Sequence, residues 1–303
     1  IRSDVSENNP EVWYSRSEQD IGGCVGCHVL SMDGDRLAYT FQMPEAQYFR
    51  IGLSEVEPER TPEALMEWSD DEPRGHFSTL DPSGTWRVTD DRGVLEIYDA
   101  VTGDYLFDLA TELPLTMPDW SQDGNWLVAI TAEDYQGDNG FGRGEVVVFE
   151  HLGDAIFGDP VTLVEFDKDN GNQYYPTFSP DSKWVAFNRA DGFFYFNDTA
   201  TLWLVAADGS SDPIELSGAN QGPNLTNSWP RWAPMPDDDV LWLAFASTRD
   251  YGNHDLDEGH AQVWAAAIDT YVAETGADPS FPAFRMVQQD LETSNHTPWW
   301  SLY

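Results

Sequence analysis

One short phrase recurs along this chain of 303 residues, and it constrains the fold more than any other feature. Its clearest copy covers residues 117–129 and reads Met-Pro-Asp-Trp-Ser-Gln-Asp-Gly-Asn-Trp-Leu-Val-Ala. Residues 175–187 repeat it closely, and the remaining copies are weaker or shorter. In order, the copies begin near Cys27, Phe77, Met117, Tyr175, Trp229 and Thr297. A chain that repeats one phrase in this way is expected to fold as a series of similar units.

Each copy predicts a strand, a tight turn and a second strand. Aromatic and aliphatic residues alternate on both sides of an Asp-Gly-like turn, as in a β-hairpin. A second strand pair follows most copies, for example residues 94–98 and 105–107 around a turn at Thr102-Gly103. Four strands per unit, at intervals of roughly 40 to 58 residues, are typical of β-propeller blades. The sequence therefore predicts an all-β fold, with residues 62–68 as its best helical candidate.

These phrases resemble the TolB-like propeller repeat, in which a Pro-x-Trp-Ser-Pro-Asp-Gly segment precedes an Ile-Ala-Phe strand. The resemblance extends over residues 27–303 and implies a single β-propeller domain spanning residues 1–303. The copies make five full blades and leave one inner strand near Thr297. We expect six four-stranded blades, the sixth closed by pairing this strand with one at residues 12–15 of the N-terminal segment 1–23. Five blades, with both ends offered to neighbouring molecules, are the alternative.

The motif Cys24-Val25-Gly26-Cys27-His28 predicts covalent attachment of one c-type haem. In such a motif two thiols add to the porphyrin vinyl groups, and the adjacent imidazole is the proximal axial ligand of the iron. Cys24 and Cys27 are the only cysteines of the chain, so no disulfide framework exists elsewhere. A local disulfide or dithiol and a metal site are the alternatives. A four-thiolate zinc site would need further ligands that do not follow here.

A second axial ligand of the iron would be a histidine or a methionine. Aligning the repeats places His28 in register with Ser78, Pro118, Pro176, Pro230 and Pro298. In the same alignment Gly26 matches His76 and His296, which belong to the blades that flank the motif. We therefore predict His296 or His76 as the sixth ligand. Other candidates are Met43, Met117, His254 and His260, whereas His151 is expected to be exposed to solvent.

The formal net charge is −39, from 54 acidic and 15 basic residues, and it limits the partners of the chain. Such a surface repels nucleic acids and anionic membranes. It favours redox partners with a basic docking surface, or life in high salt, where charge repulsion is screened. No run of about 18 apolar residues is present, so no membrane span is expected. Because c-type haem is attached on the export side, we expect a mature periplasmic, cell-surface or extracellular protein.

Three functions remain compatible with these features. The first is an exported monohaem cytochrome that transfers electrons, with the haem supplying the chemistry and the protein tuning it. The second is a haem oxidoreductase with an open sixth position. The third is a propeller used for interaction or self-assembly, with a structural haem or none. Acidic loops near residues 134–145, 167–172 and 250–258 suggest Ca²⁺ as an additional ligand, although none follows the EF-hand pattern. Hydrolase and phosphate-binding motifs are absent from the sequence.

Overall fold

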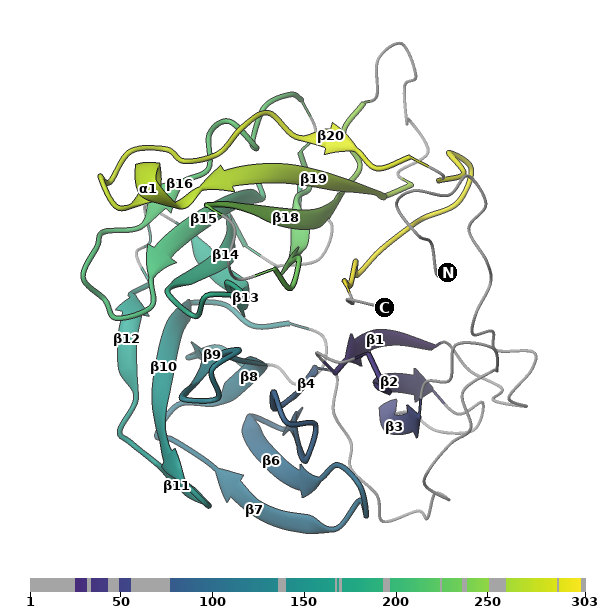
Figure 1. The fold of residues 1–303 in the computed structure, drawn as a ribbon, viewed down its shortest axis with the longest axis vertical. Coiled ribbons are helices and arrows are strands. Elements are labelled where there is room, and N and C mark those ends of the chain that lie inside the picture. Colours follow the sequence, from purple (N-terminus) through teal and green to yellow (C-terminus); the bar gives the residue numbers. More distant parts are fainter. Residues whose placement is uncertain are drawn as a thin grey trace.

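The structure is a computed structural model and consists of antiparallel sheets arranged around a common centre (Figure 1). It describes residues 25–31, 34–42, 49–55, 77–135, 140–166, 168, 171–192, 197–223, 225–235, 239–250, 260–287 and 289–300. These ranges contain twenty strands in five sheets and one short helix. The all-β prediction is therefore confirmed.

The sheets follow one another in chain order, and each has its first strand at the centre. The first sheet contains β1 (Val25–Leu30), β2 (Arg36–Gln42) and β3 (Phe49–Glu55). The second contains β4 (Ser78–Leu80), β5 (Trp86–Asp91), β6 (Val94–Asp99) and β7 (Tyr105–Leu109). The third contains β8 (Leu115–Trp120), β9 (Trp126–Ala132) and β10 (Gly144–Gly153), with β11 (Ile156–Phe157) and β12 (Val161–Val164) both paired to β10.

The last two sheets repeat this order. The fourth contains β13 (Asn172–Phe178), β14 (Trp184–Ala190), β15 (Thr201–Ala206) and β16 (Ile214–Glu215). The fifth contains β17 (Ser228–Trp232), β18 (Val240–Ser247), β19 (Gln262–Asp269) and β20 (Phe284–Arg285). The helix α1 (Thr270–Ala273) follows β19 directly, and the Asp269 side chain caps it by accepting a hydrogen bond from the Val272 amide. Sequence reasoning missed this single turn of helix, and the candidate helix at residues 62–68 lies outside the described residues.

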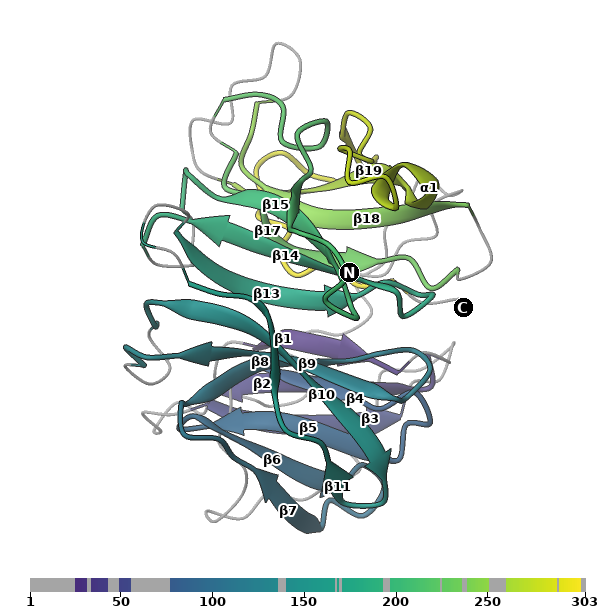
Figure 2. The same cartoon turned by 90° about the vertical axis from the view of Figure 1, so that its left-hand side faces the viewer.

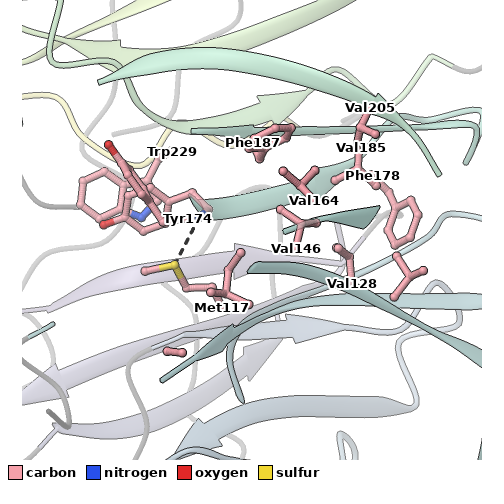
Figure 3. Close-up of a cluster of buried hydrophobic side chains, with 14 of the residues drawn as sticks. Met117, Val128, Val146, Val164, Tyr174, Phe178, Val185, Phe187, Val205 and Trp229 are labelled. Atoms are coloured by element: carbon pink, nitrogen blue, oxygen red, sulfur yellow. Dashed lines mark hydrogen bonds between the residues drawn. The ribbon is translucent and has the colours of Figure 1, made fainter. Parts of the chain in front are cut away.

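Neighbouring sheets are held together by apolar side chains in the spaces between them. Figure 3 shows the cluster between the third and fourth sheets, in which Val128 and Val146 face Val185 and Phe187. Similar clusters lie between the second and third sheets and between the fourth and fifth. The edge-on view in Figure 2 shows how the strands of successive sheets stack. Burial alternates with partial exposure in outer strands such as β6, whereas β8, β13 and β14 are buried along their whole length because other sheets cover both of their faces.

The repeated Ser-x-Asp-Gly phrase builds one turn in successive sheets. Between β8 and β9, the Ser121 hydroxyl donates to Asp123 Oδ1 at 2.6 Å and accepts from the Trp126 amide at 2.9 Å. The glycine of this turn, Gly124, has a φ of 73°, a conformation that favours glycine. The turn between β13 and β14 repeats these bonds, with Ser179, Asp181 and Trp184 in the matching positions. The sequence repeat therefore encodes hairpin turns.

His151 is half-buried at the end of β10 rather than exposed as expected. Its Nδ1 lies 3.0 Å from the carbonyl oxygen of Gly124, and its Nε2 lies 3.0 Å from that of Asp154. Its ring also contacts Trp86, Trp120 and Phe157, with centroids 5.1 to 5.4 Å apart. The sequence could not show this, because the partners come from three different strands and two turns.

We expect His151→Ala to destabilise the fold, because it removes the hydrogen bond that the ring donates to the Gly124 or the Asp154 carbonyl, together with the aromatic contacts of the ring. Each net hydrogen bond contributes about 1 kcal/mol, and lost aromatic contacts add to this. Urea unfolding of the variant should therefore show a free energy of unfolding lower by about 2 kcal/mol. The matched control is His260→Ala, whose ring is bonded to the Leu291 carbonyl at 3.3 Å. Equal stability of the two variants would contradict the role given to His151.

The number of blades is only partly visible. Five sheets are described, and residues 1–24, including the predicted closing strand at 12–15, lie outside the described part of the chain. Residues 56–76, between the first and second sheets in the chain, also lie outside it. In the described ranges no helix is long and apolar enough to cross a membrane.

Candidate functional site at the centre of the propeller

Six chain segments surround the centre of the molecule. The inner strands β1, β4, β8, β13 and β17 contact one another in that order. The sixth segment is residues 297–300, near the C-terminus. In Figure 1 this yellow part of the chain reaches the centre of the molecule. Trp299 in this segment packs against Val29 and Leu80 and lies 4.8 Å under the Arg231 guanidinium, measured to the ring centroid. Residues 297–300 therefore join the first sheet to the fifth.

A β-bulge shapes four of the five inner strands at the same position. The pairing register shifts after Gly26 in β1, after Thr116 in β8, after Tyr174 in β13 and after Ser228 in β17. A residue with positive φ follows in three of these strands and again in the sixth segment: Met117, Tyr175, Trp229 and Thr297, with φ from 48° to 53°. Each of these four residues lies directly before a proline. Bulges of this kind turn a side chain in a new direction.

Two layers of side chains result, and both line small cavities at the centre. The first layer consists of Phe77, Met117, Tyr175, Trp229 and Thr297, which line a cavity of about 20 Å³ together with His28. The second layer lies two residues further along each segment. It consists of Val29, Thr79, Asp119, Thr177, Arg231 and Trp299, which line a cavity of about 70 Å³. Residues that the repeat alignment places in register thus lie at the same level in all six segments.

The first layer is apolar and tightly packed. Tyr175 stacks on Trp229 with ring centroids 4.5 Å apart, and Phe77 meets Tyr175 edge-on at 5.8 Å. The Met117 sulfur accepts a hydrogen bond from the Tyr175 amide at 3.2 Å, drawn as the dashed line in Figure 3. Met117 is only 3 % exposed. The sequence alone did not reveal this central layer.

The haem-attachment motif overlaps the start of β1, and its last residues lie at the level of this first layer. The backbone of Cys27 and His28 forms the bulge of β1, which places Cys27 at the position that Met117, Tyr175 and Trp229 hold in the other strands. Cys24 lies outside the described residues, as does the side chain of Cys27. His28 lines the first cavity. Burial, with the positive charge of Arg231, lowers the pKa of His28 to about 4, so its imidazole is neutral at pH 7. A neutral imidazole is the form that binds a metal ion.

The candidates for the second axial ligand of the iron differ in their position relative to this cavity. His296 is half-buried and meets Trp229 edge-on, with ring centroids 5.9 Å apart. Burial also lowers the pKa of His296, which favours its neutral form. Met117 lines the same cavity as His28. His76, Met43 and His254 lie outside the described residues, and the His260 ring is bonded to the Leu291 carbonyl.

Sequence reasoning missed the two charged residues of the second layer, Asp119 and Arg231. Asp119 is 7 % exposed and accepts hydrogen bonds from the Phe178 amide at 2.9 Å and the Thr79 hydroxyl at 3.4 Å. Burial raises the pKa of Asp119, and the positive charge of Arg231 opposes this rise. The signal was available in the repeat alignment, because Asp119 and Arg231 are charged at a position that is neutral in the other four copies and should face the centre.

The described residues contain no group of three or more His, Cys, Asp and Glu side chains that could hold a metal ion. Residues 136–139, 169–170 and 251–259, parts of the acidic loops suggested for Ca²⁺, are not among them. The Ca²⁺ prediction therefore remains a prediction.

No protein-family model matches the sequence, and no curated protein does so either. Solved structures do match the fold. A protein assigned as TolB from Agrobacterium tumefaciens aligns with a TM-score of 0.56 and 15 % identity, over 87 % of this chain and 80 % of that one. A structure of a nidogen/laminin complex aligns with a TM-score of 0.51 and 11 % identity, over 88 % and 87 % of the two chains.

A further match is hydrazine synthase from Kuenenia stuttgartiensis, with a TM-score of 0.50 and 12 % identity, over 82 % of this chain and 77 % of that one. At such low identities the likeness concerns the fold alone, because one fold hosts many functions. The chain is similar to TolB-like β-propellers, as the repeats predicted.

Proposed function

We propose that this protein is an exported monohaem c-type cytochrome in which a β-propeller takes the place of the usual cytochrome fold. Cys24 and Cys27 would hold the haem covalently, and His28 would be the proximal ligand of its iron. The single observation that carries the proposal is the position of the motif: its bulge reaches the central apolar layer, and its histidine lines a cavity there as a neutral imidazole.

The residues around His28 suit a haem in their chemistry. Phe77, Met117, Tyr175 and Trp229 offer an apolar, aromatic surface next to the imidazole. The cavity of about 20 Å³ has room for roughly one water molecule, so these residues would form one side of the haem site rather than enclose it. When bound, the haem supplies an iron that changes oxidation state. The protein residues would bind the iron, exclude water from one face and adjust the reduction potential.

Electron transfer is the function that this arrangement supports best. It requires an iron with both axial positions filled and little movement of its ligands, and a rigid ring of inner strands provides a fixed support for His28. The net charge of −39 favours a redox partner with a basic surface. Covalent haem attachment agrees with a periplasmic, cell-surface or extracellular location, and the whole chain would act as one propeller domain.

The optical spectrum of the reduced protein tests this function against its two rivals. A sharp low-spin α band is expected for a six-coordinate electron-transfer haem. A high-spin spectrum that changes on addition of cyanide or carbon monoxide would favour a haem oxidoreductase with an open sixth position. A protein without haem, produced in a host that attaches haem c to other proteins, would favour an interaction module and overturn the proposal.

His296 is the candidate sixth ligand that the described residues favour, because its neutral ring contacts Trp229 beside the first cavity. We expect His296→Ala to keep the haem attached but to shift the iron to high spin. Met117→Leu is the matched control, since leucine preserves the volume of a buried side chain whose sulfur is already bonded to the Tyr175 amide. Low-spin spectra for His296→Ala together with high-spin spectra for Met117→Leu would assign the role to Met117 and contradict the prediction. Low-spin spectra for both variants would also contradict the prediction and would make His76 the next candidate for the sixth ligand.

A further inference from the structure

The second layer at the centre of the propeller contains one negative and one positive side chain among otherwise neutral residues. Asp119 comes from β8 and Arg231 from β17, and both line the larger cavity. The remaining members are Val29, Thr79, Thr177 and Trp299. Charged groups inside a protein interact strongly because little water screens them. A pair of opposite charges at this position therefore requires an explanation beyond packing.

Arg231 connects this layer to the proposed haem ligand. Among the described residues that line the first cavity with the neutral His28, Arg231 is the charged one, and it also lines the second cavity. Its guanidinium lies over the Trp299 ring at 4.8 Å, and its Nη1 donates to the Pro230 carbonyl at 3.2 Å. Arg231 thus shares the lining of the first cavity with His28 and the lining of the second with Asp119.

Asp119 is fixed in the second layer by hydrogen bonds. The Phe178 amide and the Thr79 hydroxyl both donate to its carboxylate, which keeps it within the second layer. Asp119 does not line the first cavity, whereas Arg231 does. The positive charge should thus act on His28 more strongly than the negative charge does.

We propose that Arg231 and Asp119 are a pair of opposing charges that sets the reduction potential of the iron bound by His28. The inference rests on the haem function proposed above. Neither residue touches the iron; both act through the electric field at its histidine ligand. The oxidised iron centre carries one more positive charge than the reduced one. A nearby cation therefore disfavours oxidation and raises the potential, and a nearby anion lowers it.

The test is a spectroelectrochemical titration of the haem in purified variants. Arg231→Gln is expected to lower the midpoint potential, and the nearly isosteric Asp119→Asn is expected to raise it. Each shift should reach about a tenfold change in the redox equilibrium, which is about 59 mV for one electron. Arg231→Lys keeps the charge and should restore most of the potential. The double variant Arg231→Gln with Asp119→Asn should lie between the two single variants.

The outcomes separate this inference from the haem proposal. Haem that remains with the denatured variants shows that the cofactor is present, whatever its potential. If haem is present but the potentials of both single variants are unchanged, the charge-pair inference alone is overturned. The same holds if both potentials shift in the same direction, because a general loosening of the site would move both variants alike. If Arg231→Gln does not fold by circular dichroism, Arg231→Met replaces it, since methionine keeps an apolar stem over Trp299. A wild-type protein without haem would instead overturn the proposed function.

Discussion

Deletion of residues 299–303 is expected to lower the free energy of unfolding by about 3 kcal/mol or more. The deletion removes Trp299 and Trp300, and burial of each large side chain contributes roughly 1.5 to 3 kcal/mol. Trp299 packs against Val29 and Leu80 of the first two sheets and lies under Arg231 of the fifth. Without it, the first and fifth sheets would lose a shared contact at the centre of the propeller.

Chemical unfolding followed by tryptophan-independent circular dichroism measures this effect. Trp299→Phe is the matched control, because phenylalanine keeps an aromatic ring between Val29 and Arg231 and should recover a large part of the stability. Deletion of residues 301–303 alone leaves both tryptophans in place and separates their effect from that of shortening the chain. Wild-type stability of the 299–303 deletion would contradict the view that the C-terminal segment closes the centre.

The fold could be predicted from the sequence because its signals are local. The Ser-x-Asp-Gly phrase encodes a turn in which the Ser121 hydroxyl bonds to Asp123 and to the Trp126 amide, at most five positions away. The alternation of buried and polar residues encodes the strands on either side. Aligned copies also predicted which positions share one level of the propeller. The central cavities bear this out, since their linings repeat the same register in six segments.

The contents of the centre could be predicted only in part. The motif at Cys24, Cys27 and His28 carries its chemistry in adjacent residues and was therefore visible. The shared cavity lining of Asp119 and Arg231, and the contacts of His151 with rings from three other elements, bring together residues far apart in the chain. Such long-range contacts leave no periodic pattern in the sequence. His151 was expected at the surface for this reason, although its ring is half-buried.

The central claim is that Cys24 and Cys27 bind haem covalently, and replacement of both by alanine is expected to abolish attachment completely. A thioether bond survives denaturation, whereas an iron–histidine bond does not, so loss of both thiols removes every link that could persist. Each single variant should retain at most one link and accumulate less haem-bound protein. His28→Ala leaves both thiols in place and serves as the matched control for axial ligation.

The most direct measurement is the intact mass of the denatured protein, produced together with a c-type haem maturation system. The wild type is expected to carry the mass of one haem, together with haem absorbance that stays with the polypeptide after acid–acetone extraction. The Cys24→Ala, Cys27→Ala double variant is expected to show the bare polypeptide mass. A wild-type protein of bare mass under these conditions, or a double variant that retains covalent haem, would contradict the account.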